Sequence, residues 1–153
     1  MLSTWIKWDE RLALGLRYPQ DLLLLLLRLS LALVFFNSGL LKVQSWDSTL
    51  ELFNYDYAVP LLPPTAAAWL GTVAELTLPI LLSLGLLARL AALALFAFNA
   101  IAMWSYPDIS PAGIKDHYLW GLGFVWLFFA GSGALSLDRL LAIRMQARSR
   151  FTT

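Results

Sequence analysis

Four stretches of predominantly apolar residues divide the chain, and each is close to the length needed to cross a bilayer. They are residues 21–42, 66–87, 89–106 and 118–135. A transmembrane helix needs about 20 apolar residues at a rise of about 1.5 Å per residue. Because a backbone in hydrocarbon must satisfy its own hydrogen bonds, these stretches are expected to be helical. The pattern therefore predicts an all-α, four-transmembrane-helix bundle.

Amphipathic segments flank these spans. In residues 2–18 apolar side chains recur at helical spacing, which predicts an N-terminal interfacial helix lying among lipid headgroups. A helix packed under the bundle would show the same pattern, so both interpretations stay open. Pro19 suits the first turn of the next helix, and we expect a helix boundary there. After the fourth span, Asp138 is expected to cap a basic C-terminal helix that contains Arg139 and Arg144.

Two connections stand out between the spans. Within residues 43–65, Ser45 is expected to cap a short helix that runs through Phe53. Three prolines then predict an extended segment, and a long aromatic connection of this kind suits a lid or a docking surface. Residues 85–89 form a much shorter link, which predicts an antiparallel hairpin of the second and third spans.

Composition excludes several kinds of protein. The 153 residues are 59% hydrophobic, too apolar for an ordinary soluble domain, and we expect one integral membrane domain over residues 1–153. The net charge of +1 gives no reason to expect a nucleic-acid partner. With no cysteine and a single histidine, we expect no thiol chemistry, no iron–sulfur cluster, no haem and no metal site. Any redox cofactor is expected to be diffusible.

The positive charges predict the orientation of the bundle. With four spans, most Lys and Arg residues lie on one side, while Lys42 and Lys115 lie on the other and Arg28 lies inside. Positively charged flanks stay in the cytoplasm, so both termini are expected to be cytoplasmic. Several Trp and Tyr residues then gather at the outer interface, as in an aromatic belt.

Glu75 is the carboxylate at the centre of the second span. A charge at that depth is costly, so Glu75 must face protein, find a partner or bind a proton. Counted from the cytoplasmic ends of their spans, Arg28 lies about 9 Å deep, Asn99 about 14 Å and Glu75 about 18 Å. We therefore predict that these three side chains form one polar layer. Asn37 lies further out and is expected to cap it.

This polar layer has a structural and a functional interpretation. In the first, Arg28 and Glu75 form a buried ion pair that fixes helix register, or Arg28 extends to cytoplasmic headgroups. In the second, Glu75 accepts protons, while Arg28 and Asn99 set its charge state and orient a polar headgroup. A quinone suits the second interpretation, because it needs an apolar slot for its tail and hydrogen-bonding groups for its head.

Four further residues are candidates for binding such a cofactor. Phe35 and Phe96 are expected to line the slot beside Asn37, although phenylalanines in a bundle more often serve as core or lipid-facing residues. His117 stands at the outer mouth of the fourth span and can exchange protons there, because histidine titrates near neutral pH. A lone interfacial histidine is more often simply solvated, so that interpretation also stays open.

Three motifs follow one another along the chain. They read LRLSLALVFFNSGLLK in the first span, AELTLPILLSLGLLARLAALAL across the second and third, and GSGALSLDRLL at the end of the fourth. In order and spacing they resemble the DoxX family of small four-helix bacterial membrane proteins, over about residues 22–141. The residues that match the family's motifs are Arg28, Gly39, Lys42, Glu75 and Asp138.

The resemblance implies a multi-pass protein of the bacterial inner membrane. Some relatives look like membrane subunits of thiosulfate:quinone oxidoreductase, and others are linked to oxidative-stress complexes, modified-peptide maturation or metal handling. The expected function is a small membrane subunit of a redox system linked to quinone, and whether the chain itself is catalytic stays open. One alternative is a non-catalytic anchor that recruits soluble enzymes; another is a proton-coupled small-solute transporter. The expected partners are membrane lipids and either partner proteins or a second copy of the chain.

Overall fold

Six helices make up nearly all of the chain in the computed structural model. The structure describes residues 2–149, with side chains described for residues 15, 16 and 18–147. The helices are α1 (Leu2–Gln44), α2 (Trp46–Tyr55), α3 (Pro64–Leu84), α4 (Ala88–Ser105), α5 (Pro111–Ala130) and α6 (Leu137–Ser149). No strand occurs in residues 2–149, which confirms the all-α class.

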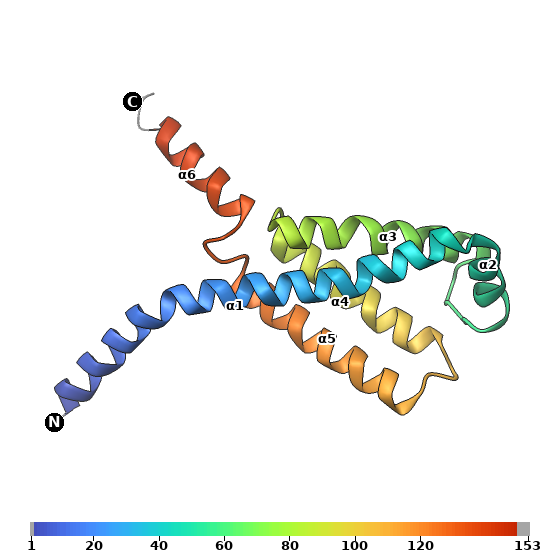
Figure 1. The fold of residues 1–153 in the computed structure, drawn as a ribbon, viewed down its shortest axis with the longest axis horizontal. Helices are drawn as coiled ribbons and strands as arrows, with labels where there is room; N and C mark the ends of the chain where they lie inside the picture. The colour runs from blue at the N-terminus through green and yellow to red at the C-terminus, as the bar shows by residue number, and fades with distance from the viewer. Residues whose placement is uncertain (1, 150–153) are drawn as a thin grey trace.

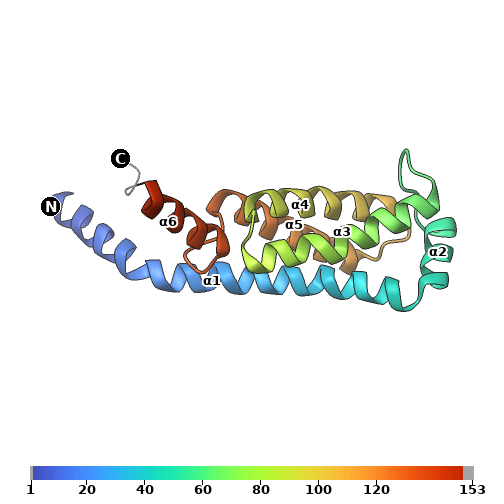
Figure 2. The same cartoon turned by 90° about the horizontal axis from the view of Figure 1, so that it is seen from above.

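Four of these helices form the bundle. α1 packs against α3 and α5, and α4 packs against the same two helices. α2 and the connection after it cover one end of the bundle, whereas α6 and the first part of α1 extend beyond the other end (Figures 1 and 2). The core is built from leucine, alanine and phenylalanine side chains, which include Leu24, Leu31, Phe35, Leu82, Leu95, Phe124 and Leu127.

Three helical segments of the described chain are long and apolar enough to cross a membrane. They are Tyr18–Gln44, Pro64–Leu84 and Ala88–Ser105. Their outward faces expose leucine, isoleucine and valine, as expected for contact with lipid tails. α5 is long enough, but Lys115, Asp116 and His117 in its first half lower its mean hydropathy. It is not among the candidate spans, so the fourth crossing stays a prediction.

α5 also differs in its bounds from the expected residues 118–135. It begins at Pro111 because the Ser110 hydroxyl accepts a hydrogen bond from the Gly113 amide at 3.1 Å, and proline suits the first helical position. It ends before Gly131, whose φ of +82° leaves the helical region. Capping therefore placed the helix earlier than the hydropathy pattern indicated.

The expected helix boundary at Pro19 is wrong, because α1 is one helix from Leu2 to Gln44 with Pro19 inside it. A proline inside a helix removes one hydrogen bond and bends the axis without always ending it. Figure 2 shows α1 curving in its N-terminal part. The apolar face expected within residues 2–18 lies mostly outside the described side chains, so the interfacial role stays a prediction.

The connection between α1 and α3 contains the expected short helix. In α2, Trp46, Leu50 and Phe53 lie on one side and pack together. Ser45 is the N-cap residue, but the expected side-chain cap is wrong, because its hydroxyl makes no capping hydrogen bond. Instead, Thr49 bonds through its hydroxyl to the carbonyls of Lys42 and Ser45, each at 3.0 Å. The segment expected to be extended is only partly so, because residues 60–62 turn and Leu61 has a φ of +65°.

The α3–α4 hairpin is held by a carboxylate from the far end of the chain. α3 ends at Leu84 with Gly85 as its C-cap, and Leu87 precedes α4 with a positive φ of +50°. The Asp138 carboxylate accepts hydrogen bonds from the amides of Leu87 and Ala88 at 2.9 and 3.0 Å. The prediction that Asp138 caps α6 is therefore wrong, and the Ser136 hydroxyl accepts from the Arg139 amide of that helix at 3.3 Å.

We expect Asp138→Ala to lower the free energy of unfolding by about 0.5–2 kcal/mol, because two amides at the start of α4 lose their acceptor. Thermal unfolding in one mild detergent measures the loss. Asp108→Ala is the control, since Asp108 is exposed in the α4–α5 connection. Equal stability of the two variants would show that water replaces the carboxylate without cost.

Candidate functional site

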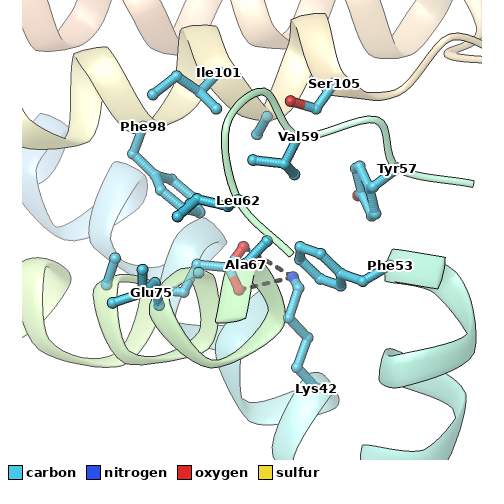
Figure 3. A pocket seen from close by; sticks show the side chains of 14 residues that line it. Lys42, Phe53, Tyr57, Val59, Leu62, Ala67, Glu75, Phe98, Ile101 and Ser105 are labelled. Carbon is cyan, nitrogen blue, oxygen red and sulfur yellow. Dashed lines mark hydrogen bonds and ion pairs between the residues drawn. The ribbon is translucent and has the colours of Figure 1, made fainter. Parts of the chain in front are cut away.

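An ion pair lies inside the bundle between α1 and α3. Lys42 Nζ lies 2.7 Å from one carboxylate oxygen of Glu75 and 2.9 Å from the other. The Ser38 hydroxyl donates to the same carboxylate at 3.1 Å and accepts from Lys42 at 2.9 Å. Only 13% of the Lys42 side chain and 7% of the Glu75 side chain are exposed. Figure 3 shows the pair side-on.

The register of α1 against α3 places these groups together. Gly39 faces Glu75 so closely that a Cβ on Gly39 would lie 3.0 Å from the Glu75 Cβ. Ser38 and Lys42 lie four residues apart, so both side chains project from the same face of α1. On α3, Gly71, Glu75 and Pro79 are buried, and their spacing of four residues places them on one face of the helix. A small residue at position 39 thus brings the two backbones close enough for a direct ion pair.

An apolar cavity of about 260 Å³ lies on one side of the ion pair. Its walls are formed by α3, α4, the end of α2 and the connection after α2 (Figure 3). Leu70 on α3 and Ile101 on α4 are lining residues that are also half-exposed on the apolar outer face of the bundle. The cavity is therefore bordered by the surface that faces lipid. The other main lining residues are Phe53, Tyr57, Val59, Leu62, Gly71, Ala74, Phe98 and Ala102.

A second, more polar cavity of about 180 Å³ borders the other side of the pair. We call it the polar cavity. Lys42, Glu75, Tyr57, Phe98 and Ala102 line both cavities. The remaining lining residues of the polar cavity are Val34, Phe35, Ser38, Tyr106, Ile109, His117 and Trp120. The ion pair is thus a shared wall between the two cavities.

Two tyrosines and the histidine give the polar cavity further proton-carrying groups. The rings of Tyr57 and Tyr106 lie 5.3 Å apart. Burial, and next the negative charge of Glu75, raise the pKa of the Tyr57 phenol, which therefore stays protonated. His117 precedes the expected fourth span. Its imidazole contacts the buried Asn99 side chain, and Asp116 precedes it in the chain.

The expected layer of Arg28, Asn99 and Glu75 is wrong, because each of these side chains has a different partner. Arg28 is fully buried and donates to the Leu135 carbonyl at 2.5 Å, next to Gly85 at the end of α3. That position lies about 15 Å along α3 from Glu75. The ion pair expected between Arg28 and Glu75 is accordingly wrong, and Lys42 takes that place. Depths counted separately for each span could not give the register between helices.

Asn99 is also buried, but it pairs with α5. Its amide nitrogen donates to the His117 carbonyl at 2.9 Å, and its oxygen lies 2.8 Å from His117 Nδ1. His117 lines the same cavity as Glu75, whereas Asn99 lines neither cavity and contacts the polar cavity's wall through the histidine. His117 was expected at the outer mouth of the fourth span, and the structure places it in the wall of the polar cavity together with Glu75.

The other expected cofactor-binding residues divide into two groups. Phe35 is buried and lines the polar cavity, where Trp120 contacts it edge-on at 5.6 Å. Asn37 and Phe96 are exposed and line neither cavity. Asn37 thus faces away from the layer that it was expected to cap.

A match to the DoxX family model covers residues 23–107, which is more than half of the chain. The chain belongs to the DoxX family. A protein of Haemophilus influenzae, named only "Uncharacterized protein", is 31% identical over 125 residues, which cover 77% of this chain and 82% of the relative. No solved structure matches the chain.

The matched part of this DoxX protein contains the ion pair and most of both cavities. Ser38, Lys42, Tyr57 and Glu75 all lie within residues 23–107, whereas His117 lies beyond them. Sequence reasoning named Glu75 but missed Ser38, Lys42 and Tyr57 as parts of its site. The spacing of Ser38 and Lys42 was the available signal, since it places a hydroxyl and an ammonium on one helical face.

Proposed function

We propose that this DoxX protein is a membrane subunit of a redox system that binds a quinone headgroup at the Lys42–Glu75 pair. The observation that carries the proposal is the position of that pair, which forms the wall between an apolar and a polar cavity. A buried ion pair contributes little net stability, and ionisable groups inside a membrane are kept mostly for function. We therefore assign the pair a functional role in addition to holding α1 and α3 together.

The chemistry of the pair suits both redox states of a quinone. The Lys42 ammonium donates to a quinone carbonyl, and the Glu75 carboxylate accepts from a quinol hydroxyl. Reduction of one quinone consumes two electrons and two protons and yields the quinol. The protons pass through the polar cavity, and the electrons come from a soluble oxidoreductase that docks on the bundle. The resemblance to quinone-linked subunits supports the same assignment.

The apolar cavity suits the headgroup. Its volume of about 260 Å³ is close to the lower end of the range for small-molecule pockets, about 300–1,000 Å³. Leu70 and Ile101 lie at its lipid-facing border, so the isoprenoid tail leaves the headgroup directly into the bilayer. Phe98 and Tyr57 provide aromatic walls for the ring.

The proposed setting is the bacterial inner membrane, with α5 as a fourth span and both termini in the cytoplasm. Arg89 lies in the first turn of α4, at the end of the bundle from which α6 extends with Arg139 and Arg144 (Figure 1). Positively charged flanks favour the cytoplasm. The ion pair and α2 then lie toward the outer face.

We expect Ala74→Phe to weaken binding of a short-chain quinone by at least about tenfold, because the ring fills the apolar cavity. Tryptophan quenching by decylubiquinone in lipid nanodiscs measures the affinity. Val73→Phe is the matched control, since Val73 is the preceding residue and faces outward. Unchanged affinity in a folded Ala74→Phe variant would rule out quinone binding at this cavity.

A membrane anchor is the second candidate function, and the position of α6 favours it. This helix extends away from the bundle and exposes Leu140, Ile143 and Met145. An anchor predicts that truncation after Leu141 releases a soluble partner enzyme, whereas Ala74→Phe leaves that partner bound.

A further inference from the structure

We propose that Asn99 is a positioning residue that holds His117 as its Nδ1–H tautomer and leaves Nε2 free to accept protons in the polar cavity. The tautomer follows from hydrogen-bond geometry alone. The role of the histidine as a proton carrier rests on the proposed quinone function.

The orientation of the Asn99 amide follows from its two contacts with His117. One amide atom lies 2.9 Å from the backbone carbonyl of His117, and a carbonyl can only accept. The NH₂ group must therefore face that carbonyl. The amide oxygen is then the atom 2.8 Å from His117 Nδ1, and it too can only accept. Nδ1 must carry the proton.

The second ring nitrogen is consequently bare in neutral His117. A neutral imidazole carries one proton, so a protonated Nδ1 leaves a lone pair on Nε2. Asn99 is only 4% exposed, which keeps water from competing for these two bonds. The Trp120 ring packs against the imidazole at 5.0 Å, edge to face, and restricts its rotation.

The bare nitrogen is accessible and belongs to a side chain that lines the polar cavity. Within the described chain Nε2 has no hydrogen-bond partner, and it is not among the polar atoms sealed from solvent without one. His117 lines the polar cavity together with Glu75 and Lys42, and a polar space of about 180 Å³ has room for several waters. A proton accepted by Nε2 from this water forms the imidazolium, which returns it to the water beside Glu75. The histidine is regenerated unchanged.

The charged and titratable groups around His117 come from every neighbouring element. Asp116 on α5 favours the imidazolium. Across the polar cavity, the positive charge of Lys42 on α1 opposes it and the negative charge of Glu75 on α3 favours it. Tyr57 and Tyr106 line the same cavity and carry phenol hydroxyl groups. The surroundings of His117 therefore carry charges of both signs, and Asn99 fixes which ring nitrogen reacts.

The test uses the fact that His117 is the only histidine in the chain. Protein labelled with ¹⁵N-histidine, in lipid nanodiscs, gives one imidazole spectrum. At pH 8 we expect a protonated Nδ1 and a bare Nε2, which is the less common tautomer of free histidine. In Asn99→Ala the ring should revert to the Nε2–H form. Asn37→Ala is the control, because Asn37 is exposed and lines neither cavity.

Asn99→Asp provides the conservative variant. Its carboxylate loses the donor to the His117 carbonyl but still accepts from Nδ1, so the tautomer should be retained, and the added charge should raise the titration midpoint of His117 by about one pH unit or more. An Nε2–H tautomer in the native protein, or no change in Asn99→Ala, would overturn the positioning role. A correct tautomer with a Nε2 that does not titrate between pH 4 and pH 9 would overturn the proton-acceptor role. These spectra need no quinone, so they stand apart from the result with Ala74→Phe.

Discussion

Lys42→Met should lower the free energy of unfolding by about 3–5 kcal/mol, because it leaves the Glu75 carboxylate buried without its counter-ion. Methionine keeps most of the volume of the lysine stem, so the loss comes from the missing charge rather than from a cavity. Chemical or thermal unfolding in one detergent at fixed lipid content measures it. Lys115→Met is the control, since Lys115 is exposed on α5.

The double variant Lys42→Met/Glu75→Gln separates stability from binding. Removing both charges takes away the uncompensated carboxylate, so most of the lost stability should return, as buried pairs replaced by neutral groups often show. Quinone binding should not return, because neither the ammonium nor the carboxylate remains. If the double variant is as unstable as Lys42→Met, the lost stability comes from disturbed packing around residues 42 and 75 and not from an unpaired carboxylate. A double variant that still binds quinone would remove the ion pair from the proposed mechanism.

The second large effect is expected at the other end of α3, where Gly85→Ala should destabilise the fold. Gly85 has a φ of +66°, a conformation that costs a residue with a Cβ about 1–3 kcal/mol. The new Cβ would also overlap with Arg28 Nη1 and lie 2.6 Å from the Ser136 Cβ. Arg28 is fully buried and bonded to the Leu135 carbonyl, so it has no room to move away. Overpacking should add about 1–3 kcal/mol.

Gly15→Ala is the matched control for this substitution. Gly15 lies within α1, and a Cβ there would meet nothing within 4 Å. Alanine at that position should be neutral or slightly stabilising, by up to about 1 kcal/mol. The comparison uses thermal unfolding of both variants in the same detergent. If Gly85→Ala unfolds at the same temperature as Gly15→Ala, Arg28 is more mobile than its complete burial indicates.

The helices were predictable from the sequence, whereas the partners of the polar residues were not. An apolar run of fixed length predicts a span whatever lies beside it, so α3 and α4 appear close to the expected residues. The need of Glu75 for a partner was also predictable, because hydrocarbon cannot solvate a carboxylate. Which cation meets it depends on the register of α1 against α3, and Gly39 sets that register through backbone approach. The spacing of Ser38 and Lys42 places both on one face of α1, but it does not tell which residue of α3 they meet, and the sequence analysis paired Glu75 with Arg28 instead.

The candidate site shows the same division. His117 and Phe35 were predicted from residue type and position, and the structure places both at the polar cavity. Asn37 was predicted from polarity alone, and the structure turns it outward. A polar residue in an apolar run has several helical directions open to it, and only packing decides among them.

The cap on α4 has a consequence for how the chain reaches this structure. The amides of Leu87 and Ala88 gain their acceptor only from Asp138, which is synthesised about fifty residues later. The hairpin of α3 and α4 thus enters the bundle with the first amides of α4 uncapped, and the last part of the chain supplies the cap. A nascent protein halted before residue 138 would expose the uncapped α3–α4 connection to the cell's proteases.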